Sequence, residues 1–200
     1  LLPEQTKQPE YNFKKWSPEP WWEEFSKELN YPNYAIVHPG SGDSAPNLNA
    51  EQYILIIRLL LENTSWSVLL TGISEEEKLI RELASGFPEE RVKKSAGRFS
   101  LVQLFSIIRN SSLLVTSSTG PLHMANAAGT PLLGFFCPAK PHTPDRWGPY
   151  DQQKWVVTPN LNGPETCQLK KCPYGGCLQK LTELEITEIV CNQRLKELNT

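Results

Sequence analysis

The chain has 200 residues, of which 39% are hydrophobic, and its 20 basic and 22 acidic side chains give a formal net charge of −2 at pH 7. This length and composition are sufficient for one large domain or two small domains with a real hydrophobic core. The lack of a basic excess argues against a nucleic-acid-binding protein, and no apolar run approaches the roughly 20 residues needed for a transmembrane segment.

Strand patterns alternate with helix patterns along most of the chain. Residues 1–33 are rich in Pro, Lys, Glu and Trp, and we interpret them as an interdomain linker with a short helix. The elements predicted after them are a strand at 34–38, a helix at 51–62, a strand at 68–70, a helix at 74–85, a strand near Val92, a helix at 100–109, a strand at 113–116, a helix after Gly120, strands at 132–136 and 155–158, and a closing helix at 182–198. Capping-box patterns begin the helices at Ser74 and Thr182. We predict an α/β fold, with a Rossmann-like parallel sheet, helices on both faces, and one domain over residues 34–200.

Three loops rich in small residues directly follow predicted strands, at residues 40–42 (GSG), 71–72 (TG) and 118–121 (STGP). The carboxyl ends of parallel strands form one edge of a sheet, and ligands bind there. A helix that begins after Thr119, with its hydroxyl as cap, would present unpaired N–H groups and a positive dipole end to phosphate. The pattern therefore predicts a diphosphate site, although an ordinary capped helix is the structural alternative.

Five pieces of the sequence, in order and spacing, resemble the heptosyltransferases of glycosyltransferase family nine. They are residues 38–42 (HPGSG), 71–72 with Glu76, Leu101, 119–124 (TGPLHM) and 146–149 (RWGP). The resemblance covers roughly residues 34–158. It implies the carboxyl-terminal, donor-binding half of a GT-B glycosyltransferase, in which two Rossmann-like domains face each other. Members typically transfer heptose from ADP-heptose to a growing lipopolysaccharide core, with inversion and without a metal ion.

The resemblance also implies the partners and the site. The nucleotide-sugar donor is a substrate, so neither a cofactor nor a metal is expected. The catalytic base and the lipid-linked glycan acceptor belong to the amino-terminal domain, so this chain should bind donor without turnover. The expected location is cytoplasmic, either free or peripheral at the inner membrane face. The predicted donor-binding residues are Ser41, Gly42, Thr71, Gly72, Glu76, Leu101, Ser118, Thr119, Gly120, Pro121, Leu122 and His123.

Two departures from the family pattern concern charge. Ser118 stands where the family usually has Asp. The loop after the first predicted strand, which we call the first loop, reads DSAPN at residues 43–47 and lacks the basic residue that the family usually has there. We expect Asp43 to face solvent or cap the next turn, and donor affinity to be weak. A hypothesis from charge balance is that Lys140 or Arg146 supplies the missing cation. The alternative function is a degenerate, non-catalytic paralogue that serves as a binding or scaffolding module.

Other residues keep a structural interpretation beside the functional one. Glu76 is a candidate for the ribose hydroxyls, yet it also complements the positive start of its helix. His123 is interpreted as a binding or positioning residue, and Trp147 by default as a packing residue. The cysteines at 167, 172 and 177 are spaced unlike common zinc sites and favour a structural loop. A dinucleotide-dependent oxidoreductase is disfavoured because no GxGxxG motif with a following acid is present. The odd total of five cysteines fits a reducing compartment.

Overall fold

The computed structural model describes residues 20–29, 33–42, 45–138, 142–150, 152–159 and 176–198. Its centre is a six-stranded sheet in the order β3-β2-β1-β4-β5-β6, with every neighbouring pair parallel. The strands are β1 (Tyr34–His38), β2 (Ser67–Gly72), β3 (Val92–Ala96), β4 (Leu113–Ser117), β5 (Leu132–Phe135) and β6 (Val156–Val157). The predicted parallel α/β fold is therefore confirmed.

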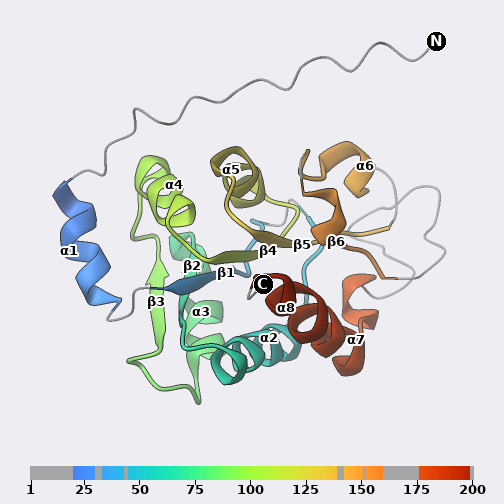
Figure 1. Cartoon of the computed structure of the whole chain (residues 1–200), viewed down its shortest axis with the longest axis horizontal. Helices are drawn as coiled ribbons and strands as arrows, with labels where there is room; N and C mark the ends of the chain where they lie inside the picture. The colour runs from blue at the N-terminus through green and yellow to red at the C-terminus, as the bar shows by residue number, and fades with distance from the viewer. Residues whose placement is uncertain are drawn as a thin grey trace, which may run out of the picture.

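Helices cover both faces of this sheet. In Figure 1, α4 and α5 lie on one side of the strands, and α2, α7 and α8 lie on the other. The helices are α1 (Pro20–Glu28), α2 (Ala50–Asn63), α3 (Glu77–Ala84), α4 (Leu101–Arg109), α5 (Gly120–Ala128), α6 (Pro144–Trp147), α7 (Glu183–Thr187) and α8 (Lys196–Leu198). None of the helices in the described part of the chain is both long enough and apolar enough to cross a membrane.

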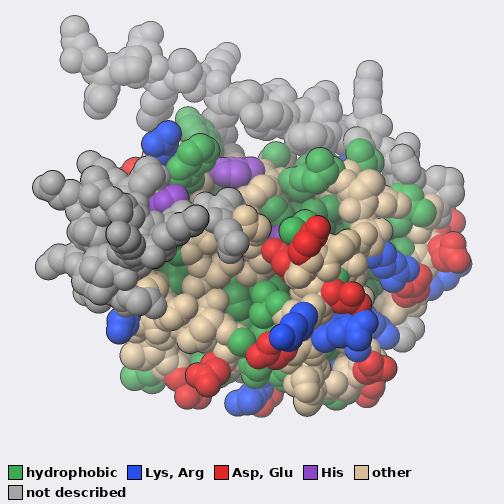
Figure 2. All heavy atoms as spheres, turned by 180° about the vertical axis from the view of Figure 1, so that it is seen from behind, with side chains coloured by type: hydrophobic (Ala, Val, Ile, Leu, Met, Phe, Trp, Pro, Cys, Tyr) green, Lys and Arg blue, Asp and Glu red, His purple; other side chains and the backbone are tan. Residues whose placement is uncertain are grey.

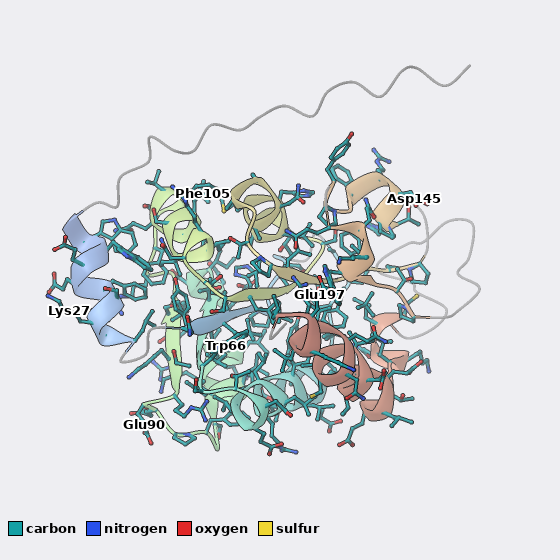
Figure 3. The ribbon with its side chains drawn as sticks, in the orientation of Figure 1. Lys27, Trp66, Glu90, Phe105, Asp145 and Glu197 are labelled. Atoms are coloured by element: carbon teal, nitrogen blue, oxygen red, sulfur yellow. The ribbon has the colours of Figure 1, made fainter. Side chains whose placement is uncertain are left out.

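The strands have continuous apolar sequences because their side chains are buried on both faces of the sheet. Successive side chains of a strand point to opposite sides, so Ala35 and Val37 of β1 enter one core and Tyr34 and Ile36 enter the other. Figure 3 shows the side chains of both layers, with Phe105 on α4 above the sheet and Trp66 below it. Each strand therefore stabilises two cores at once.

The short helix predicted within residues 1–33 is present as α1 and packs on the sheet domain. Phe25 is buried beside Tyr34 and Phe99, and the Arg98 guanidinium lies 5.3 Å from the Phe25 ring centroid. Arg98 Nη1 also pairs with Glu28 Oε2 at 2.8 Å. The role of residues 1–33 as an interdomain linker stays a prediction.

The closing helix begins as predicted but does not stay α-helical. The Thr182 hydroxyl accepts the N–H of Glu185, whose carboxylate in turn accepts the N–H of Thr182. After α7 the chain widens into a π-helical segment, Glu188–Leu195, before α8. Arg194 in this segment is buried and stacks 4.1 Å from the Trp155 ring centroid, and burial lowers its pKa to about 10 although Glu197 opposes the shift.

Gln52 connects α2 to the start of the C-terminal helix. Its Nε2 donates to the carbonyls of Leu178 at 3.0 Å and Leu181 at 2.9 Å, while its Oε1 accepts the Asn49 N–H at 2.9 Å. Gln52 is buried. If its amide were removed, the carbonyls and the N–H that it pairs would be left without a partner and away from water. The amide therefore joins two segments that are distant in sequence.

Replacing Gln52 by the similarly sized Met should lower the free energy of unfolding by about 1–3 kcal/mol, because buried carbonyls lose their donors. Urea denaturation at neutral pH measures this change. Glu51→Gln, at the exposed neighbouring position, is the matched control and should stay within about 0.5 kcal/mol of the parent. Equal stability of Gln52→Met and the parent would contradict the role given to the amide.

Candidate functional site

The order of the strands creates a crevice between β1 and β4. From β1 the chain proceeds to β2 and β3 on one side, then returns to β4 and continues to β5 and β6 on the other. Ligands of open α/β sheets bind outside the carboxyl ends of the strands at such a reversal. The loops after β1, β2 and β4 all leave this edge, as predicted from their small residues.

A pocket of about 400 Å³ opens at this edge, and we call it the carboxyl-edge pocket. It is lined by Ala45, Ser118, Thr119, Gly120, His123, His142, Arg146 and Trp147. None of these eight lining residues is acidic, and a Cβ built on Gly120 meets nothing within 4 Å. Figure 2 shows histidine side chains gathered near a basic side chain at the upper left of this face. The pocket thus combines the start of α5 with one guanidinium, of Arg146, and two imidazoles, of His123 and His142.

Hydroxyl groups hold the ends of β1 and β4 together beneath the pocket. Thr116 Oγ1 donates to the His38 carbonyl at 3.1 Å, and it lies 3.0 Å from Thr119 Oγ1. On the other side of β4, the buried Tyr53 hydroxyl lies 3.3 Å from Ser117 Oγ. Thr119 is therefore at the N-cap position, but its side chain does not cap α5, in contrast to our prediction. The hydroxyl is turned back toward Thr116. Pro121 has no N–H and the Leu122 N–H donates to the Thr119 carbonyl at 3.1 Å, so the Gly120 N–H is the donor that this first turn can offer a ligand.

His38 and Thr71 connect the ends of β1 and β2. His38 Nδ1 lies 2.9 Å from Thr71 Oγ1, and both side chains are buried. Burial lowers the pKa of His38 to about 4, although the nearby Glu76 charge opposes the shift. The imidazole is therefore neutral at pH 7, and the Thr71 hydroxyl serves this internal contact.

Glu76 fastens the first loop to the loop after β2. Its carboxylate accepts the Ile73 N–H at 2.9 Å and approaches the Gly42 N–H at 3.4 Å. A Cβ on Gly40 or Gly72 would overlap this carboxylate, so both glycines make room for it. Glu76 is thus a structural connector here, and its contact with a ribose stays a prediction.

The helix start predicted at Ser74 is wrong in detail. A 3-10 turn, Ser74–Glu76, precedes α3, and no hydroxyl caps either element. The reason is that Glu76, and not Glu77, folds back onto the Ile73 N–H. The acidic run therefore stabilises the turn through one carboxylate rather than through a Ser-based capping box.

The predicted phosphate donors of the first loop are engaged within the protein. Ser41 Oγ donates to the Ala45 carbonyl at 2.9 Å and accepts from Asn47 Nδ2 at 2.9 Å. The Gly42 N–H faces Glu76. Contacts of Ser41 and Gly42 with phosphate stay predictions, and Asp43 lies outside the described residues.

The other predicted residues divide between surface and core. Leu101 is 72% exposed at the start of α4, whereas Leu122 is fully buried and packs against Gly134. Pro121 occupies the first turn of α5 without lining the pocket. His142 was missed, because only the fold of the segment after β5 brings it to the pocket. Lys140, Cys167 and Cys172 lie outside the described residues, and Cys177 is buried.

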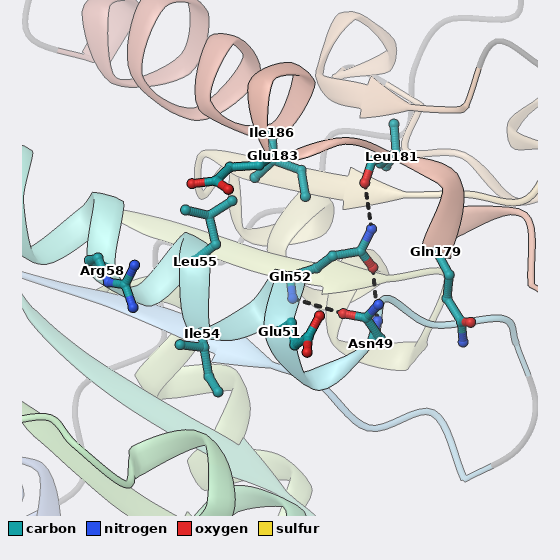
Figure 4. A pocket seen from close by; sticks show the side chains of 10 residues that line it. All are labelled: Asn49, Glu51, Gln52, Ile54, Leu55, Arg58, Gln179, Leu181, Glu183 and Ile186. Atoms are coloured by element: carbon teal, nitrogen blue, oxygen red, sulfur yellow. Dashed lines mark hydrogen bonds between the residues drawn. The ribbon is translucent and has the colours of Figure 1, made fainter.

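A second pocket, of about 420 Å³, lies between α2 and the C-terminal helix (Figure 4). Its lining includes two carboxylates, Glu51 and Glu183, together with Arg58. The capping box of Asn49 and Gln52 forms one of its walls. The two carboxylates make this pocket a poorer site for an anion than the carboxyl-edge pocket.

Comparisons with known proteins point to one family. The family model described as glycosyltransferase family 9 (heptosyltransferase) matches residues 2–178. The chain is 35% identical to lipopolysaccharide core heptosyltransferase OpsX of Haemophilus influenzae over 62% of this chain and 35% of that protein. It is 26% identical to lipooligosaccharide heptosyltransferase 2 of the same species over 70% of this chain and 39% of that protein.

The fold also matches a solved enzyme structure. ADP-heptose lipopolysaccharide heptosyltransferase II of Escherichia coli superposes with a TM-score of 0.67, at 21% identity, over 88% of this chain and 52% of that chain. The predicted GT-B-type fold is thereby confirmed. The chain spans a little over a third of the length of the two Haemophilus relatives.

Gly40→Ala should displace the Glu76 carboxylate and lower the free energy of unfolding by about 1 kcal/mol, the usual contribution of such hydrogen bonds. Glu76→Ala removes the same bonds, so the double variant should be no less stable than Glu76→Ala alone. Urea denaturation of the four proteins measures the coupling. Gly120→Ala, where the added methyl meets open space, is the control and should be near neutral. Additive losses in the double variant would rule out this contact as the reason for glycine at position 40.

The neutral His38 predicts a pH dependence of stability. The histidine titrates at about pH 4 when folded and near 6.5 when unfolded, so the unfolded state binds the extra proton in this window. Stability should therefore fall as the pH decreases from 6.5 toward 4. Between pH 7 and pH 5 the parent should lose about 2 kcal/mol more than His38→Asn, at 1.36 kcal/mol per pKa unit. Urea midpoints at both pH values measure the difference, and parallel losses would contradict it.

Proposed function

This chain belongs to glycosyltransferase family 9, and we propose on that premise that its carboxyl-edge pocket binds the diphosphate of a nucleotide-sugar donor. The observation that carries the proposal is the composition of the pocket. The start of α5, with Ser118, Thr119 and Gly120, lines the same space as His123 and Arg146, and none of the described residues that line it is acidic. Unpaired N–H groups at a helix start and nearby cations are the features that bind phosphate groups.

The chemistry assigned to this part of the enzyme is stabilisation of the leaving group. In an inverting transfer, an acceptor hydroxyl attacks the anomeric carbon on the face opposite the diphosphate. The bond from that carbon to the phosphate oxygen breaks, and the diphosphate leaves with its electron pair. A site that is complementary to the developing negative charge lowers the barrier without a metal ion. The base that takes the hydroxyl proton is assigned to the part of the enzyme that binds the acceptor.

The donor that we propose is ADP-heptose. The Escherichia coli structure carries this donor in its name, and the two Haemophilus relatives are named for heptosyl transfer to lipooligosaccharide or lipopolysaccharide. Leu101, exposed at the start of α4, and Glu76 are assigned to the nucleoside, and Ser41 and Gly42 to the diphosphate. For Gly42 to reach phosphate, its N–H must leave the Glu76 carboxylate. The acceptor is a lipid-linked glycan, and the protein works in the cytoplasm at the inner membrane face.

The second candidate is a degenerate module that keeps the fold without transfer activity. Two observations favour it. Ser118 lines the pocket where family members usually have Asp, and the donors of Ser41 and Gly42 are already engaged within the protein. A site with fewer groups available to the sugar and the diphosphate would bind the donor weakly, if at all.

Calorimetric titration of the chain with ADP, UDP and GDP, with and without magnesium, tests the first candidate. We expect selective binding of ADP with the same affinity in both conditions, since the positive charge comes from the protein. Binding that requires magnesium would contradict the metal-independent site.

Ser118→Asp separates the two candidates in the same assay with ADP-heptose as ligand. A variant that gains donor binding which the parent lacks would support the degenerate module. Equal binding by both proteins would reject it and would leave Ser118 as a tolerated replacement.

A further inference from the structure

The first loop and the helix after it supply no cation to the carboxyl-edge pocket. No Lys or Arg occurs between residues 39 and 57, and the next basic residue, Arg58, lines the second pocket between α2 and the C-terminal helix. A diphosphate brings two or three negative charges into a pocket in which none of the described lining residues is acidic. The positive charge that balances them must therefore come from another segment.

The segment between β5 and β6 supplies such a charge through Arg146. This residue lies on the single turn α6 and lines the carboxyl-edge pocket together with Ser118, Thr119 and Gly120 of the α5 start. Its guanidinium carbon is 5.1 Å from the ring centroid of Trp147, which lines the same pocket. Stacking on an indole orients a guanidinium while leaving its N–H groups at the edge free to donate.

Backbone contacts fix the turn that carries Arg146. The N–H groups of Arg146 and Trp147 donate to the Thr143 carbonyl, both at 3.2 Å, and the Gly148 N–H donates to Pro144 O at 2.6 Å. A Cβ on Gly148 would come within 2.5 Å of that Pro144 oxygen, so the turn closes tightly there. Arg146 is therefore held at the pocket by a compact turn.

Arg146 has no ion pair among the described residues, unlike several other arginines. Arg81, Arg98 and Arg194 each lie within 4.0 Å of a carboxylate oxygen. Asp145, its neighbour on α6 and labelled in Figure 3, is not among the lining residues of the pocket. Arg146 thus lines the pocket with a charge that no described side chain pairs in a salt bridge.

We propose that Arg146 is a ligand of the donor diphosphate and replaces the cation that the first loop lacks. Its planar guanidinium donates two parallel N–H bonds to phosphate oxygens on one side, while the start of α5 binds them on the other. This assignment rests on the proposed function, because it names the residue that holds the leaving group of that same donor. It also makes α6 part of the donor site.

The test is calorimetric titration of the full chain with inorganic pyrophosphate and with ADP. Arg146→Gln should lower the affinity for both ligands by at least tenfold, which is the usual minimum effect of losing a charge-assisted bidentate pair. Arg146→Lys keeps the charge but lacks the planar guanidinium, so its affinity for both ligands should lie between those of the parent and Arg146→Gln. Arg58→Gln removes the same charge at the second pocket and should bind like the parent. Urea midpoints equal to that of the parent exclude misfolding of the variants.

The outcomes separate this proposal from the proposed function. If the parent binds ADP and Arg146→Gln binds it equally well, the role of Arg146 is overturned but the proposed donor site is not. Equal weakening by Arg146→Gln and Arg58→Gln would indicate a general charge effect and would also overturn it. If the parent binds pyrophosphate but no nucleotide, the nucleotide-sugar function is contradicted. Loss of pyrophosphate binding in Arg146→Gln would still support Arg146 as a ligand of the anion. Binding of neither ligand would overturn both.

Discussion

The pairing of β1 with β4 is the contact on which the candidate site depends. These strands are adjacent in the sheet although the chain between them forms β2, β3 and three helices. Their register places His38 beside Thr116, so the Thr116 hydroxyl can reach the His38 carbonyl and the start of α5 lies next to the first loop. A shift of this register by one residue would turn the alternating side chains of β1 to the opposite cores. Core packing and site geometry are thus fixed by the same pairing.

Most of the fold was predictable because its signals are local. Continuous apolar runs such as residues 113–116 identify buried strands, and the hydroxyl and carboxyl pair of Thr182 and Glu185 identifies a helix start within four residues. The wrong predictions of helix capping at Ser74 and Thr119 have a common cause. Each hydroxyl or carboxylate near a helix start has several possible partners, and the local sequence pattern does not decide between them. Thr119 contacts Thr116, and Glu76 reaches the first loop 34 residues earlier in the chain.

The site was partly predictable for the same reason. Strand-end loops with small residues predicted a site at one edge of the sheet, and Ser118, Thr119, Gly120 and His123 line one pocket at that edge. Their contact with a ligand stays a prediction. His142 carries no sequence signal that links it to α5, since its place depends on the path of the chain after β5. Charge is arranged differently from the family pattern as well. The positive charge of Arg146 lies on the segment between β5 and β6. The loop after β1 contains no Lys or Arg, and its Gly42 N–H donates to Glu76.

The Gln52 contact with the C-terminal helix has a consequence for biosynthesis. Gln52 lies directly after the first loop, yet its amide binds carbonyls 126 and 129 residues later in the chain. During synthesis, α2 therefore leaves the ribosome long before residues 178 and 181, and the Gln52 amide lacks these two partners for that interval. The amino-terminal side of the crevice reaches its final packing only when the last helix docks.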